Sequence, residues 1–370
     1  MSKFESIHIQ GFRRLVDVKL ALRPLMVMIG ANGSGKTSLL DAWRLLARSA
    51  EGKLGDTLSS LGGLNEILTR PRSMGAKIGV LEFHVEFEQV IPRKIDLSSK
   101  PEYATSKSEY ALQIFPRGIG YRVEEKESRL RRLFTAENQK VENRLETWLS
   151  EPTNPVERIT QELLSSVWFA RPFELSQVRL PQSVRPATLP GEQGETLIAC
   201  LYSLRETDRD RFEVVEDTLR AAFPDFERLE FPPVAAGMLA LAWKDRQFTQ
   251  PIYMHQLSEG TLRFLWLTAL LLSRDLPAVT LIDEPEVSLH PQLLMLLADL
   301  MREASMRTQL IVATQSDHLI GCLKPEEVLV ADVEDGATTF TWGDDLDLDH
   351  WLKDFTLDQL WTMGVLGGRS

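Results

Sequence analysis

Residues 30–37 read Gly-Ala-Asn-Gly-Ser-Gly-Lys-Thr, which fits the phosphate-binding loop pattern G-x-x-x-x-G-K-[ST]. Glycines let a backbone turn its N–H groups toward phosphate oxygens, and the helix that follows such a loop adds the positive end of its dipole. In this pattern Lys36 would bind the outer phosphates and Thr37 would hold Mg²⁺. The sequence therefore predicts a nucleoside triphosphate site made by Gly30, Asn32, Gly33, Ser34, Gly35, Lys36, Thr37 and Ser38.

The residues on either side of this loop predict the elements that must hold it. The apolar run from Leu25 to Ile29 indicates a buried strand that leads into the loop. Beyond it, Leu39, Leu40, Trp43 and Leu46 recur at helical spacing. The loop thus lies between a strand and a helix, which is the context that its chemistry requires.

A second set of chemical residues follows two later strands. Val279 to Ile282 is apolar and ends in Asp283 and Glu284. In P-loop enzymes a carboxylate at such a strand end helps to hold Mg²⁺, so we expect Asp283 to do this. Glu284 is placed to polarise a water molecule for attack on the γ-phosphate. The strand Leu310 to Ala313 leads to Gln315, which could sense the γ-phosphate or orient that water.

The segment Leu257-Ser258-Glu259-Gly260-Thr261 precedes a further predicted helix. Ser-x-Gly before a helix is a common N-cap and a weak signal when it stands alone. Here it follows the phosphate-binding loop and comes shortly before Asp283, an order that makes the signal strong. Ser258 and the next N–H groups are expected to form a second anion-binding helix start.

These residues together resemble the ATPase heads of the ABC superfamily, in the branch of SMC, RecF and OLD-type proteins. Ile9-Gln10-Gly11-Phe12-Arg13 is similar to the opening strand of that family, in which the Arg lies near the nucleotide. The string from Asp283 to Pro291 resembles its Walker B strand and D-loop. The chain looks closest to compact single-chain ATPases of the AAA-21 type, which occur in bacterial defence and mobile-element operons.

The resemblance implies an α/β P-loop NTPase fold with a mixed β-sheet lobe and a helical insertion lobe. It implies ATP and Mg²⁺, and a homodimer or higher oligomer whose heads enclose the nucleotides. Ser258, Glu259 and Gly260 would then act in trans, and Ser288, Leu289 and His290 would lie at the seam. Gln315 stands where the family more often has His, and Gln can donate a hydrogen bond but cannot carry a proton. The Q-loop glutamine stays open among Gln89, Gln177 and Gln182.

Composition excludes several classes. The 370 residues carry 43% hydrophobic residues and a formal charge of −11, which is typical of a globular protein and not of one that coats nucleic acid. Cys200 and Cys322 form no C-x-x-C pair, so no zinc hook is expected. The first residues lack the apolar core of a signal peptide, and no apolar run could span a bilayer. We therefore expect a cytoplasmic protein with no membrane contact.

The pattern of apolar, charged and turn-forming residues along the chain predicts five segments. They are an N-terminal ATPase lobe (1–95), an inserted helical and irregular lobe (96–190), a connecting segment (191–250), a C-terminal ATPase lobe (251–335) and a tail (336–370). Residues 4–30, 78–88 and 110–114 alternate as strands, whereas 52–75 is predicted to be loop. Residues 124–149 are charged and predicted to be helical, and 195–222 returns to helix.

Evidence for a nucleic-acid partner is weaker. Candidate cationic groups are Arg70, Arg72 and Lys77, then Arg129, Arg131 and Arg132, and finally Arg171, Arg179 and Arg185. Each group also fits an ordinary solvated face. The prediction that the protein binds double-stranded DNA therefore rests more on the resemblance than on charge. Asp344 to Asp349 could suggest a metal cluster, but residues 331–350 hold acids and no Lys or Arg, which favours a solvated acidic face.

Two functions follow from these observations. The first is an ATP-hydrolysing, dimerising head that senses or clamps DNA and licenses a separately encoded effector, such as a toprim-type nuclease, in genome defence or repair. The second is a regulatory nucleotide-dependent scaffold that acts on protein partners, with little turnover and no DNA contact.

Overall fold

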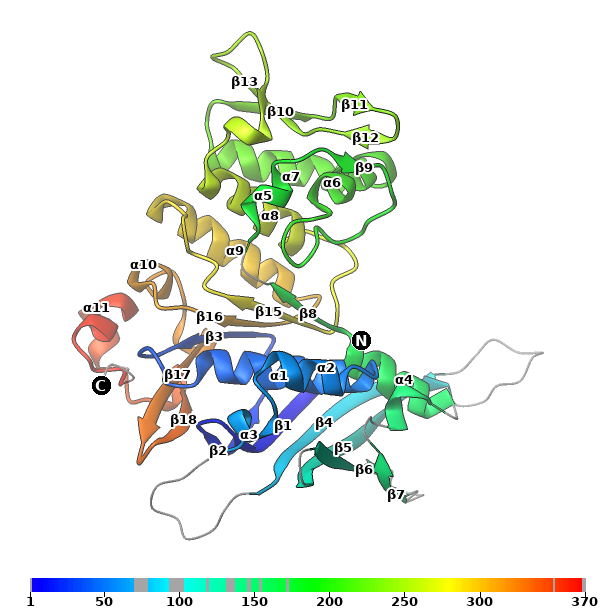
Figure 1. The fold of residues 1–370 in the computed structure, drawn as a ribbon. Helices are drawn as coiled ribbons and strands as arrows, with labels where there is room; N and C mark the ends of the chain where they lie inside the picture. Colours follow the sequence, from blue (N-terminus) through cyan, green and yellow to red (C-terminus); the bar gives the residue numbers. More distant parts are fainter. Residues whose placement is uncertain are drawn as a thin grey trace. The chain divides into compact units, whose positions relative to one another are not determined.

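The computed structural model describes residues 2–69, 79–92, 103–117, 120–130, 137–144, 148–152, 155–170, 173–348 and 350–367. Its residue contacts divide the chain into two units (Figure 1). Unit 1 comprises Met1–Val167, Pro325–Lys353 and Met363–Ser370. Unit 2 comprises Trp168–Lys324 and Asp354–Thr362. The phosphate-binding loop therefore belongs to unit 1, and Ser258, Glu284 and Gln315 belong to unit 2.

An antiparallel sheet of six strands forms one layer of unit 1 (Figure 1). In spatial order its strands are β2 (Leu15–Ala21), β1 (Lys3–Phe12), β4 (Leu81–Pro92), β5 (Tyr103–Arg117), β6 (Gly120–Leu130) and β7 (Glu137–Arg144). Alternate residues are buried in the described parts of β1, β4 and β5, among them Ile7, Phe83 and Leu112. The alternation follows from the strand period of two, which turns every second side chain toward one face.

Helix α1 (Lys36–Ala50) packs on the buried face of this sheet. Trp43 is fully buried and meets the ring of Phe4 edge-on, with ring centroids 5.0 Å apart. The other helices of unit 1 are α2 (Leu54–Ser60), α3 (Leu64–Ile67) and α4 (Pro155–Ser165). Strand β3 (Leu25–Ile29) is buried along its whole length and pairs in parallel with β17 (Val328–Glu334). β17 continues into β18 (Ala337–Trp342) as an antiparallel hairpin.

Unit 2 combines a parallel strand pair, short antiparallel strands and helices (Figure 1). The parallel pair is β15 (Val279–Asp283) and β16 (Gln309–Ala313), in the register Val279↔Gln309 to Asp283↔Ala313. Its other strands are β8 (Val167–Ala170), β9 (Gln182–Ser183), β10 (Phe226–Glu230), β11 (Pro233–Ala235), β12 (Met238–Leu239), β13 (Ala242–Asp245) and β14 (Ile252–Tyr253). Its helices are α5 (Leu175–Val178), α6 (Leu197–Thr207), α7 (Arg209–Ala222), α8 (Glu259–Leu271), α9 (Leu294–Ser305), α10 (Asp317–Ile320) and α11 (Leu357–Thr362).

The parallel pair fixes where the carboxylates of unit 2 lie. β15 is apolar because Val279, Leu281 and Ile282 are buried, and it ends at the half-buried Asp283. β16 ends at Ala313, opposite Asp283. The carboxyl ends of parallel strands meet at one edge of their sheet, so Asp283, Glu284 and Gln315 gather at that edge.

Two predictions about local structure are wrong. Residues 124–149 were predicted to be helical, but the described part forms strands β6 and β7 and a 3₁₀ turn, η1 (Trp148–Ser150). Glu, Lys and Arg favour helix, yet pairing along β5 outweighs this preference, in the register Ile114↔Val123 to Lys107↔Leu130. Residues 52–75 were predicted to be loop, but α2 and α3 form there, with Leu54, Leu58 and Ile67 buried.

Among the described residues, no helix is both long enough and apolar enough to cross a bilayer.

Candidate nucleotide-binding and hydrolysis residues

The predicted phosphate-binding loop turns directly into the first turn of α1. Gly35 is the N-cap of the helix and has φ 108°, a left-handed conformation that suits glycine. A Cβ at Gly35 would lie 2.3 Å from the hydroxyl oxygen of Thr338, and one at Gly30 would lie 2.4 Å from the carbonyl oxygen of Ala331. Glycine is therefore required at both positions by close contact with the β17–β18 hairpin.

Thr338, a residue that the sequence did not single out, holds the loop from β18. Its hydroxyl donates a hydrogen bond of 2.8 Å to the carbonyl oxygen of Ser34, and its side chain is buried. Its own N–H donates to the carbonyl oxygen of Arg14, in the turn between β1 and β2. Thr338 follows Ser34 by 304 residues, so no local pattern could have revealed the contact.

The loop passes two tests for a phosphate ligand. The Oγ of Ser34 is buried and, among the described residues, has no hydrogen-bond partner. A buried polar atom without a partner is costly, so a ligand that accepts its hydrogen bond is favoured. The ammonium group of Lys36 is buried and donates to the carbonyl oxygens of Gly30 (2.6 Å) and Ala31 (2.9 Å). Phosphate oxygens would be stronger acceptors for the same cation.

Several of the remaining residues of the loop are accessible to solvent. Asn32, Gly33 and Thr37 are exposed, and Ser38 is half-buried. A hydroxyl and a carboxylate are hard oxygen ligands, which suit Mg²⁺, so Thr37 and Asp283 have the right donor chemistry. Asp283 itself is half-buried at the end of β15.

Arg13 is held beside α1 by an ion pair. It adopts a positive φ of 50°, and its guanidinium group donates a hydrogen bond of 2.6 Å to the carboxylate of Asp41. Asp41 follows Lys36 by little more than one turn of α1. Arg13 therefore lies next to the helix that begins at the phosphate-binding loop.

In unit 2, the backbone of Glu284 is held from two sides in a left-handed conformation, with φ 47°. Its N–H donates to the carbonyl oxygen of Ala313 (2.8 Å), and its own carbonyl oxygen accepts from Arg263 of α8 (2.7 Å). A non-glycine residue in this region is strained by about 1–3 kcal/mol, and such strain persists only where surrounding contacts fix it.

Gln315 binds the side chain of Glu284, as a shared role in hydrolysis would need. Its Nε2 donates a hydrogen bond of 2.7 Å to Oε1 of Glu284. The nearby Glu286 accepts from the Thr314 hydroxyl (2.6 Å) and from the N–H of Gln315 (3.2 Å). Burial raises the pKa of the Glu286 carboxyl, although the hydrogen bond from Thr314 opposes the shift. Glu286 was not predicted as a site residue, although it lies in the string from Asp283 to Pro291, two residues after Glu284.

The predicted signature and D-loop residues contact each other within unit 2. Ser258 is the N-cap of α8, because its Oγ accepts from the N–H of Thr261 (3.1 Å). The Ser288 hydroxyl donates to Glu259 (2.7 Å), and a Cβ on Gly260 would lie 2.3 Å from the carbonyl oxygen of Ser288. Leu289 is half-buried, and the exposed His290 caps a short turn by accepting from Gln292. Ser258 and Ser288 are exposed, as a surface that meets another molecule requires.

The three Q-loop candidates have different surroundings. Gln89 is fully buried in unit 1, where its amide donates to Ser108 (2.9 Å). Gln182 lies in unit 2 and accepts from the N–H of Ile198 (2.9 Å). Internal hydrogen bonds thus account for both side chains, while Gln177 is exposed on α5.

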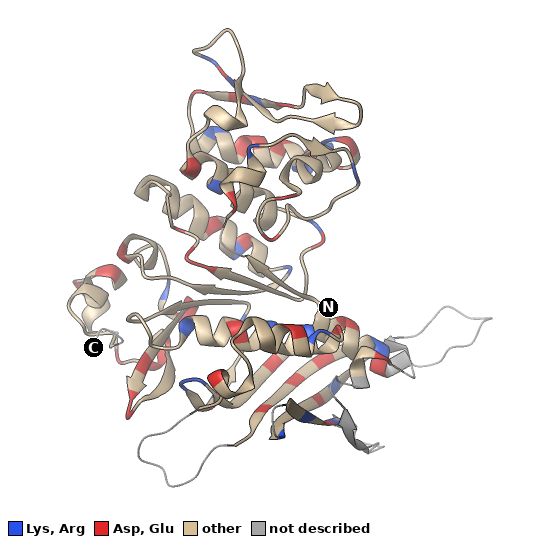
Figure 2. Cartoon of the chain, viewed as in Figure 1, with Lys and Arg blue, Asp and Glu red and all other residues tan. Residues whose placement is uncertain are grey.

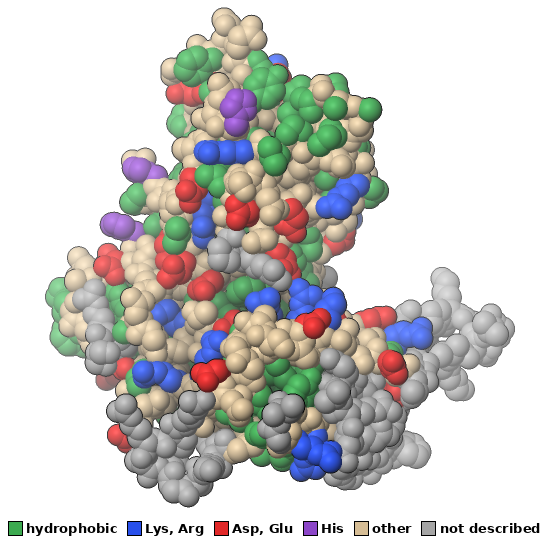
Figure 3. Space-filling model, in the orientation of Figure 1, with side chains coloured by type: hydrophobic (Ala, Val, Ile, Leu, Met, Phe, Trp, Pro, Cys, Tyr) green, Lys and Arg blue, Asp and Glu red, His purple; other side chains and the backbone are tan. Residues whose placement is uncertain are grey.

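Two of the cationic candidates, Arg179 and Arg185, have side chains that the structure describes. Arg179 donates to the carbonyl oxygen of Leu257 (3.1 Å), whereas Arg185 is exposed. Arg129 lies on β6, and its side chain is outside the described residues, as are Arg70, Arg72, Lys77, Arg131, Arg132 and Arg171. Acidic positions recur along β4 in Figure 2, and on the face drawn in Figure 3 the basic side chains form separate groups with acidic ones among them.

In the described part of the acidic segment, Asp344 pairs with Arg23 at 2.8 Å and lies in a 3₁₀ turn, η5 (Gly343–Asp345). Asp349 lies outside the described residues. In the described part of the chain, side chains with metal-ligand spacing occur at His84, Glu86 and Glu109, which are half-exposed on the antiparallel sheet.

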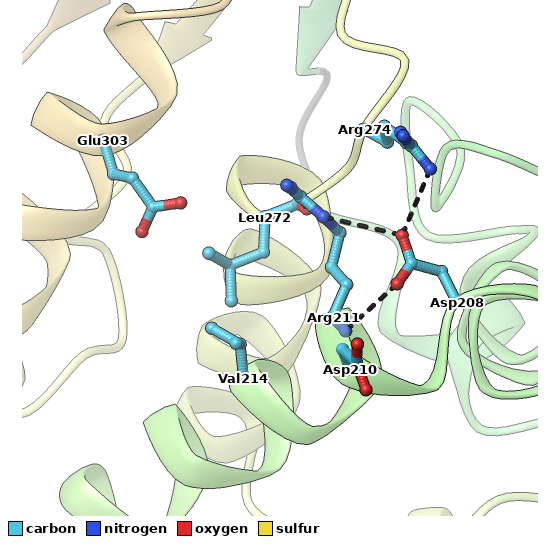
Figure 4. A pocket seen from close by; sticks show the side chains of 7 residues that line it. All are labelled: Asp208, Asp210, Arg211, Val214, Leu272, Arg274 and Glu303. Carbon is cyan, nitrogen blue, oxygen red and sulfur yellow. Dashed lines mark hydrogen bonds and ion pairs between the residues drawn. The ribbon is translucent and has the colours of Figure 1, made fainter.

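A cleft of about 400 Å³ in unit 2 contains none of the predicted site residues. Figure 4 shows its lining, which comprises Asp208, Asp210, Arg211, Val214, Leu272, Arg274 and Glu303. Arg211 and Arg274 both lie near the carboxylate of Asp208, at 4.0 Å and 3.5 Å. Asp210 and Glu303 add two further acidic groups, so this lining is unfavourable for a phosphate group.

A strand–loop–helix whose Gly30 and Gly35 are required by close contacts, an antiparallel sheet packed on that helix, and a parallel strand that ends in Asp283-Glu284 are the elements of a P-loop nucleotide-binding fold. Residues 25–321 match the family AAA_21, described as "AAA domain, putative AbiEii toxin, Type IV TA system", and the chain belongs to this family. The α/β P-loop fold and the family resemblance expected from the sequence are both confirmed. No curated protein matches the sequence.

Solved structures of SMC heads share the fold. An SMC head bound to the C-terminal winged-helix domain of ScpA has a TM-score of 0.61 and 15% identity, over 92% of this chain and 97% of that one. The SMC head of Pyrococcus furiosus, with an extended coiled coil and bound to the C-terminal domain of ScpA, has a TM-score of 0.56 and 13% identity, over 95% and 98%. The head of Pyrococcus yayanosii, with a coiled coil and joint, has a TM-score of 0.58 and 11% identity, over 95% and 99%.

Proposed function

We propose that this chain is an ATP-hydrolysing head that dimerises around ATP, senses or clamps double-stranded DNA, and licenses a separately encoded effector. A toprim-type nuclease in genome defence or DNA repair is the effector that we propose. The observation that carries the ATPase part is the phosphate-binding loop. Its Gly30 and Gly35 are required by contact, its Ser34 hydroxyl lacks a partner among the described residues, and its lysine is buried against carbonyl oxygens.

In this proposal the residues of unit 1 bind the phosphates. Backbone N–H groups from Gly33 to Thr37 donate to phosphate oxygens at the start of α1, where the helix dipole favours negative charge. Lys36 exchanges carbonyl oxygens for phosphate oxygens. Thr37 and Asp283 are the residues that would hold Mg²⁺, which neutralises phosphate charge when bound.

Glu284 is proposed as the general base that accepts a proton from the attacking water. The hydrogen bond from Gln315 to its carboxylate supports this role, because it fixes one oxygen and leaves the other to the water. The strained backbone of Glu284 is a further support, since strain of this kind gathers at functional residues.

Dimerisation is proposed through the exposed N-terminus of α8. Ser258, Glu259 and Gly260 would close on the γ-phosphate bound by a second copy, with Ser288, Leu289 and His290 at the seam. ATP then joins two heads, and hydrolysis removes the charge that the second copy binds, so the interface loosens. The ScpA domains bound to the similar SMC heads support a protein effector as a partner.

The test combines phosphate release with mass photometry, for the wild type, Lys36→Ala and Glu284→Gln, each with and without ATP and duplex DNA. We expect the wild type to hydrolyse ATP, Lys36→Ala to lose binding, and Glu284→Gln to accumulate an ATP-bound dimer. DNA should shift the assembly or the turnover. If ATP assembles the protein and DNA changes neither quantity, the scaffold function is correct and the DNA part of the proposal is wrong.

A further inference from the structure

Arg263 is a charged residue inside an otherwise apolar stretch of α8. Leu262 precedes it and the run from Phe264 to Leu271 follows it, and all of these residues are buried. Arg263 itself is only 8% exposed. Arginine is seldom buried to this extent unless it is paired, because taking a guanidinium group out of water is costly.

The contacts of Arg263 lead to the residue proposed as the general base. Its Nη2 donates a hydrogen bond of 2.7 Å to the carbonyl oxygen of Glu284, the residue with φ 47°. The Nε of Arg263 is buried and has no hydrogen-bond partner in the described part of the chain. The guanidinium group therefore donates its hydrogen bond to the turn that follows β15.

Charge explains why the guanidinium group tolerates burial there. Burial lowers the pKa of Arg263, and the carboxylates of Glu286, Glu259 and Glu284 oppose this shift. Two of these carboxylates belong to the turn after β15, and the third belongs to the first turn of α8. Arg263 thus faces acidic groups of both elements.

We propose that Arg263 is a positioning residue for ATP hydrolysis, which holds the left-handed turn at Glu284 and ties it to the helix that begins at Ser258. This inference rests on the proposed function, since it assigns a role in the same reaction. Arg263 lies one turn beyond Glu259, so a displacement of the α8 N-terminus is transmitted along the helix to the carbonyl group of Glu284. Closure of Ser258 and Gly260 on a second copy would then adjust the general base of the same chain.

Arg263→Met tests this role, because Met keeps much of the volume and removes the donor. We expect kcat to fall about 10- to 100-fold, the effect of losing a hydrogen bond from a charged group in the transition state. The Kd of a fluorescent ATP analogue should stay within about twofold, because Arg263 is not expected to touch the nucleotide.

Arg307→Met is the matched control. Arg307 also donates to a carbonyl oxygen, that of Leu271 (2.6 Å), and its Nε likewise lacks a partner among the described residues. It makes no contact with the Glu284 turn that the described residues record. Both variants should lose stability, but only Arg263→Met should lose kcat.

A double variant that combines Arg263→Met with Glu284→Gln distinguishes a role of Arg263 in positioning Glu284 from a general disturbance of the fold. If Arg263 acts through Glu284, adding Arg263→Met to Glu284→Gln should change the residual turnover by less than about twofold. Should Arg263→Met prove insoluble, Arg263→Gln takes its place in each comparison, because its amide is uncharged and shorter.

Four outcomes distinguish the two proposals. A wild type that releases no phosphate removes both. An active wild type whose Arg263→Met variant loses no more kcat than Arg307→Met overturns only the role of Arg263, as does a full additional loss in the Glu284→Gln background. A selective and non-additive loss of kcat supports it.

Discussion

Thr338→Val should weaken nucleotide binding through a residue outside every recognised motif. Thr338 is 4% exposed, and its hydroxyl donates to the carbonyl oxygen of Ser34 at 2.8 Å. Valine has the same shape and no donor, so the substitution removes this hydrogen bond without opening a cavity. The change acts on the phosphate-binding loop alone, since the N–H of Thr338 still donates to Arg14.

The size of the effect follows from the lost bond. A hydrogen bond between neutral groups contributes about 1 kcal/mol net. Without it the loop relaxes in the absence of nucleotide, and binding must restore the original conformation. The Kd for Mg-ATP should therefore rise by up to about fivefold. We expect kcat at saturating ATP to be unchanged, because Thr338 contacts neither Glu284 nor Gln315 in the described structure.

Calorimetric titration with a non-hydrolysable ATP analogue measures the Kd, and steady-state turnover measures kcat. Thr341→Val is the matched control, because Thr341 lies on the same strand and is exposed. An unchanged Kd in Thr338→Val, combined with a lower Tm, would refute the reasoning and reduce Thr338 to a residue that supports the hairpin.

Two further predictions concern unit 2. Glu286→Gln should raise Tm at pH values above the folded pKa of Glu286 and flatten the pH dependence of Tm. The pKa of this carboxyl is raised in the folded state, so its contribution to stability is complete below the usual value of 4.5 and is lost as the pH rises through the folded value. Thermal melts of both proteins across this range measure the difference, and parallel curves would contradict it. Gly260→Ala places a Cβ 2.3 Å from the carbonyl oxygen of Ser288, so it should weaken ATP-dependent dimerisation at least about tenfold while ATP still binds the monomer. Mass photometry and nucleotide titration check it, and an unchanged dimer would mean that this loop lies outside the interface.

The chemical residues of this chain were predictable because each lies at the end of an apolar strand or the start of a helix. Leu25 to Ile29 and Val279 to Ile282 are buried strands, as their composition requires. A strand of this kind delivers its next residues to the sheet edge, so Lys36 and Glu284 could be assigned from order alone. The contact from Gln315 to Glu284 followed from the same logic, since β15 and β16 are parallel neighbours.

The insertion was not predictable by the same means. Residues 120–130 include Glu124, Glu125, Lys126 and Glu127, which are good helix formers. They form a strand because β5 offers a complete ladder of partners along this segment. Charged residues stand at consecutive positions of this strand, the half-buried Glu124 and the buried Glu125, so the sequence shows no alternation of polar and apolar residues there.

The residues that hold the chemical groups were missed for one physical reason in both units. A functional group in a strained or cramped backbone conformation must be fixed by additional contacts. At Gly35 the contact comes from Thr338, and at Glu284 it comes from Arg263. Both are ordinary residues of a strand or helix with no motif of their own, remote in sequence from the group that they hold. Since the motif specifies only which group reacts, while remote contacts specify its conformation, substitutions at Thr338 and Arg263 should change binding and turnover separately.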